Sequence, residues 1–350
     1  KTGSLSGGFL TFDAVTDAGT YTVIAYNPLT GCEREMLGNF KVDPVIQQFP
    51  VYPGGILCEG VDLCMDGSEA GISYQLWLNN VPFGAEIQGD AGGNAICFGT
   101  PTVAGTYRIH AINKLTKCEI FFDKSYIVNP LPKIFVMSPV EGCPGSEITL
   151  NKCQDGFAYY LNFMPAKGPA PKKLVISDPV LCSGGGSLSF GQVFDEGVYT
   201  VQAVDPVTNC SIWMSGSTII HAEPQAYKMI PQGTACPPVA ITLENFDQNA
   251  TYYLYRNGDT LVATDNALDS KIDFGAQTLP GIYTVRAQFV FAGNFECWND
   301  MAGSLKIYPE PVKYTLLPSG PLCPPAKLFL NGSEAGVTYT LWHDTYGIRQ

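Results

Sequence analysis

Histidine is scarce in this sequence: three are present among 350 residues, and no two cysteines have the Cys-x-x-Cys spacing. Structural zinc sites draw four ligands from cysteine and histidine, usually in closely spaced pairs. The twelve cysteines instead stand singly along the chain. A zinc-binding module is therefore excluded, and we expect no metal and no other cofactor.

Basic residues are also few. Lysine and arginine number 20 against 32 acidic residues, which gives a formal net charge of −12, and they form no cluster. Because lysine and arginine drive binding to phosphate, nucleic acid is excluded as a partner. No apolar run approaches the ~20 residues of a membrane span, so direct membrane insertion is not expected. We interpret the acidity as a solubility device in preference to a calcium-binding role.

Long stretches with a helical period are missing too, and a period of two takes their place. In residues 21–25 and 199–203, tyrosine, valine and alanine share one face, as in a half-buried strand. Glycine, proline, asparagine and aspartate punctuate the chain at roughly the 8–12 residue spacing of a β-sandwich. The sequence therefore predicts an all-β protein.

A segment built around a glycine and a tyrosine occurs four times. The tyrosines are 86 (107 − 21), 92 (199 − 107) and 84 (283 − 199) residues apart, and a phenylalanine stands nine residues before each. A period of this length corresponds to one small β domain per repeat. The four segments are residues 19–23, 105–109, 197–201 and 281–285.

Turn residues divide the second repeat into the seven strands of an immunoglobulin-like (Ig-like) sandwich. We expect strand A at 45–52, B at 61–66, C at 72–79, C′ at 83–88, E at 94–98, F at 106–112 and G at 118–128. The fold class is thus a tandem array of Ig-like β-sandwich domains. One phase of strand C should belong to the core in every repeat: Tyr74, Leu76, Tyr159, Leu161, Tyr252, Leu254, Tyr339 and Leu341.

Short proline-bearing linkers mark the boundaries between repeats and predict semi-rigid coupling of neighbours. The expected units are residues 1–44, 45–130, 131–222, 223–311 and 312–350. The first unit holds only strands E to G and the last only A to C, and half a sandwich cannot bury its core. We interpret the chain as a window in a longer array, in preference to halves that complement each other between chains.

The cysteines lie at matching points of successive repeats, which is typical of an oxidised, extracytoplasmic scaffold. Cys64 and Cys97 lie on the expected strands B and E of one sheet, and Cys153 and Cys182 hold broadly similar places in the next repeat. Both are absent from the repeat after that, where Asn245 replaces the first. Joint loss indicates that each pair is a disulfide.

The other eight cysteines form a recurrent set of four pairs. The first member of each pair follows an F–G turn, and the second stands 25 residues later (143 − 118) or 26 residues later, as from Cys32 to Cys58 (58 − 32). The regular spacing favours local pairing, but in an Ig topology the two lie at opposite poles, beyond the ~7 Å Cα limit of a disulfide. The A–B pole of one domain meets the F–G pole of its successor. That favours the disulfides Cys58–Cys210 and Cys143–Cys297. If one strand were assigned to a different place in the repeat, pairing between cysteines 25 or 26 residues apart would again be possible. Partners remain unassigned for Cys32, Cys118, Cys236 and Cys323.

No catalytic constellation is present, and we expect no enzyme. His110 is out of phase with the inward-facing residues of strand F, His221 opens a linker and His343 ends a strand, so each is predicted to be a surface histidine. The glycine-rich loop at 183–187 lacks the lysine and helix start of a phosphate cradle.

Two surface features remain as candidates. Trp77, Tyr255 and Trp342 occupy the outer phase of strand C, where aromatic rings could stack on sugars, although packing across strands is the favoured interpretation. Residues 259–261 fit the short Asp-Ser/Thr-apolar pattern that resembles Bacteroidota O-glycosylation sites. Thr260 is the candidate acceptor, and a plain turn is the alternative.

Residues 104–118 read Ala-Gly-Thr-Tyr-x-x-x-Ala-x-Asn-x-x-Thr-x-Cys, with echoes at 18–32 and 196–210. With the Gly-Ser-Glu-Ala-Gly segments at 67–71 and 332–336, they resemble the repeats of giant Bacteroidota surface proteins, notably the SprB-like gliding-motility adhesins of flavobacteria exported by type IX secretion. The resemblance covers essentially the whole chain. It implies an extracellular, cell-surface location and no functional residues, because the shared motif is structural.

Two functions follow as expectations. The first is a non-catalytic repeat segment of a long adhesin filament for surface attachment or gliding. Its partners would be adjacent repeats of the same longer chain, with surface polysaccharide or other cell-surface proteins as further candidates. The second is a string of spacer domains in a secreted multidomain enzyme or carbohydrate-binding protein. The length of the parent protein separates the two.

Overall fold

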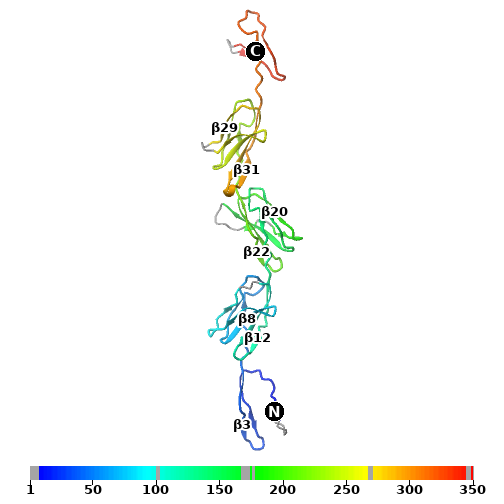
Figure 1. Cartoon of the computed structure of the whole chain (residues 1–350), viewed down its shortest axis with the longest axis vertical. Helices are drawn as coiled ribbons and strands as arrows, with labels where there is room; N and C mark the ends of the chain where they lie inside the picture. The colour runs from blue at the N-terminus through cyan, green and yellow to red at the C-terminus, as the bar shows by residue number, and fades with distance from the viewer. Residues whose placement is uncertain are drawn as a thin grey trace.

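The computed structural model describes residues 8–99, 103–166, 174–175, 178–266, 271–343 and 348–349. These residues are almost entirely β, with one three-residue 3-10 turn, η1 (Ala292–Asn294), as the only helical element among them. The repeats follow one another along an extended rod, with the two termini at opposite ends (Figure 1). The chain is a tandem array of Ig-like β-sandwiches.

The second repeat shows the plan most plainly. Its first sheet has the order β10-β7-β5, and its second has the order β6-β13-β11-β8-β9, with β12 also paired to β11. The strands are β5 (Val51–Tyr52), β6 (Leu57–Cys58), β7 (Cys64–Met65), β8 (Ile72–Leu78), β9 (Val81–Gln88), β10 (Ile96–Cys97), β11 (Gly105–Asn113), β12 (Glu119–Phe121) and β13 (Tyr126–Asn129). They correspond to A, A′, B, C, C′, E, F and a two-part G.

The third and fourth repeats keep this order. The third contains β14 (Met137–Ser138), β15 (Glu141–Gly142), β16 (Ser146–Leu150), β17 (Ala158–Pro165), β18 (Leu174–Val175), β19 (Val180–Leu181), β20 (Leu188–Val193), β21 (Gly197–Val204), β22 (Ser211–Trp213) and β23 (Thr218–Ile220). The fourth contains β24 (Met229–Ile230), β25 (Gly233–Ala235), β26 (Val239–Leu243), β27 (Thr251–Arg256), β28 (Thr260–Asp265), β29 (Asp273–Gln277), β30 (Gly281–Val290), β31 (Glu296–Asp300) and β32 (Leu305–Ile307).

Strand A differs from the single strand expected at residues 45–52. It divides in two, and its second part crosses to the other sheet, where β6, β15 and β25 pair in parallel with β13, β23 and β32. A cis X-Pro bond separates the two parts in each repeat, as at Tyr52–Pro53. The crossing places the residue that follows each A′ strand beside the end of strand G, where the chain leaves for the next domain.

Each complete sandwich has its own core, in which the repeated tyrosines are the largest buried side chains. The hydroxyl of the tyrosine in strand F donates to the carbonyl oxygen four residues earlier, which is the tyrosine corner of Ig-like folds. The first unit keeps this bond at Tyr21. The distances are 2.7 Å for Tyr21 to Asp17, 2.8 Å for Tyr107 to Val103, 3.0 Å for Tyr199 to Asp195 and 2.8 Å for Tyr283 to Leu279. The corner explains why tyrosine, and not phenylalanine, recurs here.

The tyrosines of strand C act as acceptors. In each, the phenolic oxygen receives a hydrogen bond from the backbone N–H five residues earlier, at 3.0 Å for Glu69 to Tyr74, 2.8 Å for Gln154 to Tyr159, 2.7 Å for Asp247 to Tyr252 and 2.9 Å for Glu334 to Tyr339. This bond fixes the turn between strands B and C. It accounts for the second aromatic position that recurs in the sequence.

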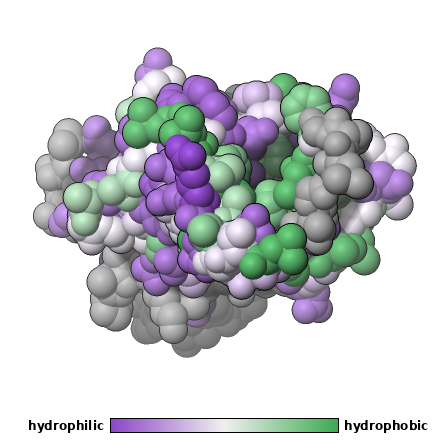
Figure 2. Space-filling model, turned by 90° about the horizontal axis from the view of Figure 1, so that it is seen from below, coloured by the Kyte–Doolittle hydropathy of each residue, from purple (hydrophilic) through white to green (hydrophobic). Residues whose placement is uncertain are grey.

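The end units are half-sandwiches within the described residues. The first contains β1 (Gly19–Tyr21), β2 (Ile24–Tyr26), β3 (Glu33–Glu35) and β4 (Phe40–Val42), and the last contains β33 (Leu316–Leu317), β34 (Phe329–Leu330), β35 (Trp342–His343) and β36 (Ile348–Arg349). The expected core residues Tyr339 and Leu341 are 41% and 60% exposed, because β33 and β34 form only a two-stranded sheet and the described residues of this unit include no strands E to G. Apolar side chains also reach the surface at the N-terminal end of the rod (Figure 2).

Candidate functional site: the junctions between repeats

Four disulfides join the cysteine pairs named from the sequence: Cys58–Cys210, Cys64–Cys97, Cys143–Cys297 and Cys153–Cys182. Two lie within a repeat and two connect successive repeats. The junctions are the candidate functional site, because two disulfides there join sandwiches that the linkers alone would otherwise connect.

Cys58 and Cys210 close the junction between the second and third repeats. Cys58 ends β6, and parallel pairing with β13 places it beside Asn129, the last residue before the linker. Cys210 ends the F–G turn of the next sandwich and is fully buried, with its Sγ 4.0 Å from the Leu57 carbonyl oxygen. The two Cα atoms are 5.6 Å apart. The turn of the following domain therefore reaches back onto the A′ strand of the preceding one.

Glu59 secures the same junction from the side of the second repeat. Its backbone N–H donates to the Asn129 carbonyl at 2.9 Å. Its carboxylate accepts hydrogen bonds from the backbone N–H groups of Ala104, at 2.8 Å, and Leu131, at 3.1 Å. Because Leu131 belongs to the linker, this carboxylate holds the linker against the end of the sandwich.

The junction between the third and fourth repeats has the same geometry. Cys143 follows β15, Cys297 lies on β31, and their Cα atoms are again 5.6 Å apart. His221 begins the linker and stacks on Phe291 of the incoming F–G turn, with ring centroids 4.2 Å apart, while Phe295 lies 5.4 Å away. Aromatic packing thus adds to the covalent bond at this junction.

The disulfides within repeats differ from each other. Cys64 and Cys97 lie directly opposite on β7 and β10, as strands B and E require. Cys182 instead follows β19, which pairs with β17 of the other sheet, and its N–H donates to the Phe157 carbonyl. Cys153–Cys182 therefore joins the turn after strand B to the segment after C′. The sequence predicts that this disulfide and Cys64–Cys97 occupy broadly similar positions in their repeats, and the structure shows that the similarity is only approximate.

Cys32, Cys118, Cys236 and Cys323 are free and exposed. Cys118 and Cys210 hold equivalent places in their F–G turns, and Cys236 follows β25 as Cys143 follows β15. The difference between bonded and free cysteines is therefore whether a neighbouring sandwich faces them.

Two of the predicted surface histidines are largely covered, which corrects the expectation from the sequence. His110 does lie on the outer phase of β11, but Trp77 and Phe121 pack over it, its side chain is 12% exposed, and it contacts Glu119 at 3.0 Å. The His221 side chain is 18% exposed because it lies in the junction, 3.5 Å from Glu141. His343 is in β35, and its side chain lies outside the described residues.

The candidate sugar-stacking aromatics do not form one surface. Trp77 is half-buried and meets Phe121 edge-on at 4.9 Å, so it packs across strands. Tyr255 is half-buried as well, whereas Trp342 is 52% exposed. Thr260, the candidate glycosylation site, is exposed at the start of β28.

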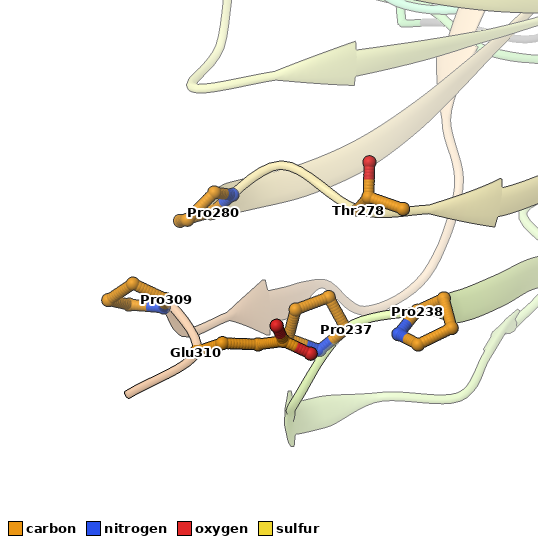
Figure 3. A pocket seen from close by; sticks show the side chains of 6 residues that line it. All are labelled: Pro237, Pro238, Thr278, Pro280, Pro309 and Glu310. Atoms are coloured by element: carbon orange, nitrogen blue, oxygen red, sulfur yellow. The ribbon is translucent and has the colours of Figure 1, made fainter. Parts of the chain in front are cut away.

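A pocket of about 290 Å³ lies at the end of the fourth sandwich, lined in part by Pro237, the residue after Cys236 (Figure 3). It corresponds to the corner that Glu59 fills in the second repeat, since Pro237 takes the place of Glu59 and Pro280 that of Ala104. A proline at these positions supplies neither the carboxylate nor the N–H that close the corner. The lining residues are Pro237, Pro238, Thr278, Pro280, Pro309 and Glu310.

Within the described ranges, no three histidine, cysteine or acidic residues are grouped so as to hold a metal ion. No helix in the part of the chain that the structure covers is long and apolar enough to cross a membrane.

Neither protein-family models nor curated proteins include a match to this chain. Solved structures of domain arrays do resemble it. The insect immune protein hemolin is 13% identical over 77% of this chain and 78% of its own, with a TM-score of 0.25. The FN1–FN3 domains of chicken CNTN1 are 7% identical over 73% and 99%, with a TM-score of 0.24. Three N-terminal domains of Hoc, an outer capsid protein of bacteriophage RB49, are 12% identical over 73% and 96%, with a TM-score of 0.27. The assignment of the fold rests on the sheet topology described above.

Proposed function

We propose that the chain is a non-catalytic repeat segment of a long cell-surface adhesin filament, which supplies length and mechanical strength. The observation that carries this proposal is the pair of crossing disulfides. The loops closed by Cys58–Cys210 and Cys143–Cys297 overlap, so each sandwich from the second to the fourth is bonded to a neighbour. Cross-links of this kind suit a filament under shear in an oxidising, extracellular environment.

The motif resemblance supports placing the filament on a bacterial cell surface, in the manner of flavobacterial gliding adhesins exported by type IX secretion. Adjacent repeats of the same chain are its first partners. Surface polysaccharide or other cell-surface proteins would bind elsewhere in the filament, since the outer aromatics Trp77 and Tyr255 are half-buried by strand packing.

The test is deletion of whole repeats from the native parent protein. We expect the filament to shorten and attachment under flow to weaken gradually with each repeat removed, because each contributes length. Substituting His110 by alanine should leave attachment unchanged and serves as the control. An abrupt loss of attachment on substituting His110, with folding intact, would contradict the proposal. A parent with few repeats beside a catalytic domain would favour the spacer alternative.

A further inference from the structure

The disulfide within the second repeat lies on the outer face of its sandwich. On β7, Met65 is fully buried in the core, so Cys64, one residue earlier, points to the opposite face of the sheet. On β10, Ile96 packs in the same core, and Cys97, one residue later, points outward as well. The two cysteines are directly opposite each other on this outer face.

Cys97 is the accessible sulfur of the pair. It is exposed, whereas Cys64 is 7% exposed. The other bonded cysteines are half-buried or buried, and Cys153 and Cys182 belong to the hydrophobic core of the third repeat. Exchange between a thiol and a disulfide requires that the thiolate reach a sulfur atom. A dissolved thiol therefore reaches Cys97 before any other bonded sulfur of the described residues.

The sheet also decides the direction of attack. Tyr52 of β5, Cys64 of β7 and Cys97 of β10 stand in one row across the strands, and β10 is the edge strand. A thiolate attacks in line with the bond that breaks, from the side away from the leaving sulfur. The approach to Cys97 comes from beyond β10, where no strand of the described residues pairs, whereas the approach to Cys64 comes from the side of Tyr52. The geometry favours attack on Cys97 with Cys64 as the leaving group.

The other complete repeats show that the sandwich does not need a disulfide at this place. Strand register identifies the counterparts of the two cysteines, and all of them are polar residues that are half-buried or exposed. The position is therefore a surface position of the fold, and the disulfide is an addition specific to the second repeat. The counterparts are Thr149 and Ser189 in the third repeat, and Thr242 and Asp273 in the fourth.

The charge of this part of the chain indicates which class of thiol it attracts. Between Lys41 and Arg108 the sequence has seven acidic residues and no lysine, arginine or histidine. Two of the acidic residues, Asp62 and Asp66, flank Cys64 at two residues on either side and are exposed. Charges of one sign act over about 10 Å at 0.1 M ionic strength. They repel an anionic thiol such as glutathione and attract an aminothiol.

We propose that Cys97 is a thiol-exchange site for small aminothiols on the outer face of the second repeat. The aminothiol's thiolate bonds to the Cys97 sulfur, the Cys64–Cys97 bond breaks, and its electron pair leaves on the Cys64 sulfur, which then takes up a proton. The products are a mixed disulfide at Cys97 and a thiol at Cys64. The exchange consumes no oxidant, because one disulfide replaces another.

Exchange at Cys97 opens the cross-link between β7 and β10 and leaves both interdomain disulfides in place. The second sandwich then unfolds more readily, while the array stays covalently joined. This inference goes beyond the proposed function and does not rest on it. The site is the same in an adhesin filament and in a string of spacer domains.

The test treats the oxidised 350-residue chain with cysteamine under native conditions, after its free thiols have been blocked with N-ethylmaleimide. Iodoacetamide quenches the reaction, and the peptides are mapped without reduction. We expect cysteamine on Cys97 and the iodoacetamide label on Cys64, with exchange about tenfold or more faster than at any other disulfide. Cysteamine on Cys64, equal rates at all four disulfides, or no exchange would each overturn the proposal.

An anionic thiol of similar size, 2-mercaptoethanesulfonate, tests the class of ligand. Each rate is divided by the rate of the same thiol with the uncharged hydroxyethyl disulfide, which removes differences in intrinsic reactivity. The corrected rate should be about tenfold higher for cysteamine at low salt, and the two rates should converge at 1 M salt. Asp62→Asn combined with Asp66→Asn should weaken the preference. Equal corrected rates at low salt would contradict an aminothiol site.

A matched variant locates the exchange. Cys64→Thr combined with Cys97→Ser copies the residues that the third repeat has at these places, so the second sandwich should still fold. This variant should take up no cysteamine in the second repeat, while exchange at Cys153–Cys182 keeps its original rate. Uptake as fast as in the unaltered chain would assign the exchange to another disulfide and overturn the proposal.

Discussion

The recurrent tyrosines of this chain form hydrogen bonds that hold the backbone at two turns. The tyrosine of strand F donates to a carbonyl at the E–F corner, and the tyrosine of strand C accepts from an N–H at the B–C turn, as Tyr283 and Tyr252 do in the fourth repeat. Both rings are also buried in the core. Because one side chain serves packing and turn geometry together, a residue that supplies only one of them should lower the free energy of unfolding of its repeat.

Tyr252 makes the fourth repeat sensitive to alkali. Burial, with a smaller contribution from the charge of Asp247, raises the pKa of Tyr252 from 10.0 to about 12. The folded state therefore keeps a proton that the unfolded state loses, so the contribution to stability is complete below about pH 10 and falls as the pH rises toward 12. We expect the urea midpoint of this repeat to drop across that range, as followed by hydrogen exchange.

Tyr252→Phe removes the titrating group and should make the alkaline loss shallower. Tyr255→Phe alters a half-buried tyrosine on the same strand and is the matched control. An equally steep loss in Tyr252→Phe would assign the alkaline sensitivity to another group.

At the scale of strands, the order A, B, C, C′, E, F and G could be predicted because alternation and turn residues are local signals. The division of strand A could not, since parallel pairing of β6 with β13 joins residues about seventy positions apart. The covering of His110 by Phe121 depends in the same way on the position of β12, which no alternation pattern in the sequence fixes. The interdomain pairs followed from which poles meet, an argument of topology that holds without atomic detail.

The disulfide between β7 and β10 should stabilise the second repeat alone. Replacing Cys64 and Cys97 together by serine should lower the free energy of unfolding of that repeat by about 2–5 kcal/mol, because the cross-link restricts its unfolded chain. The fourth repeat has no internal disulfide and is the control within the same molecule. Hydrogen exchange resolved by repeat measures both, and an equal loss in the fourth repeat would contradict a local effect.

Over the whole molecule, the order of the bonded cysteines matters more than their number. They alternate along the chain as Cys58, Cys143, Cys210 and Cys297, so each interdomain loop encloses one end of the other. Independent staples within each domain would leave the linkers as the weakest points. Crossing bonds instead carry tension past every linker between the second and fourth sandwiches.

This arrangement predicts how far the rod can be stretched. Without disulfides the path from Cys58 to Cys297 is 239 residues (297 − 58). With both bonds, the shortest covalent path crosses from Cys58 to Cys210, runs back along the chain to Cys143 and crosses to Cys297, which is 67 residues (210 − 143). Full reduction should therefore lengthen the unfolded chain by at least about 500 Å, at ~3.3 Å per residue. Force spectroscopy on the chain held at its two ends measures this difference directly. Removing only the Cys143–Cys297 pair should give little of the gain, because Cys58–Cys210 then leaves a path of 87 residues (297 − 210). Full lengthening after loss of that one pair would show that the bonds do not cross in the native array.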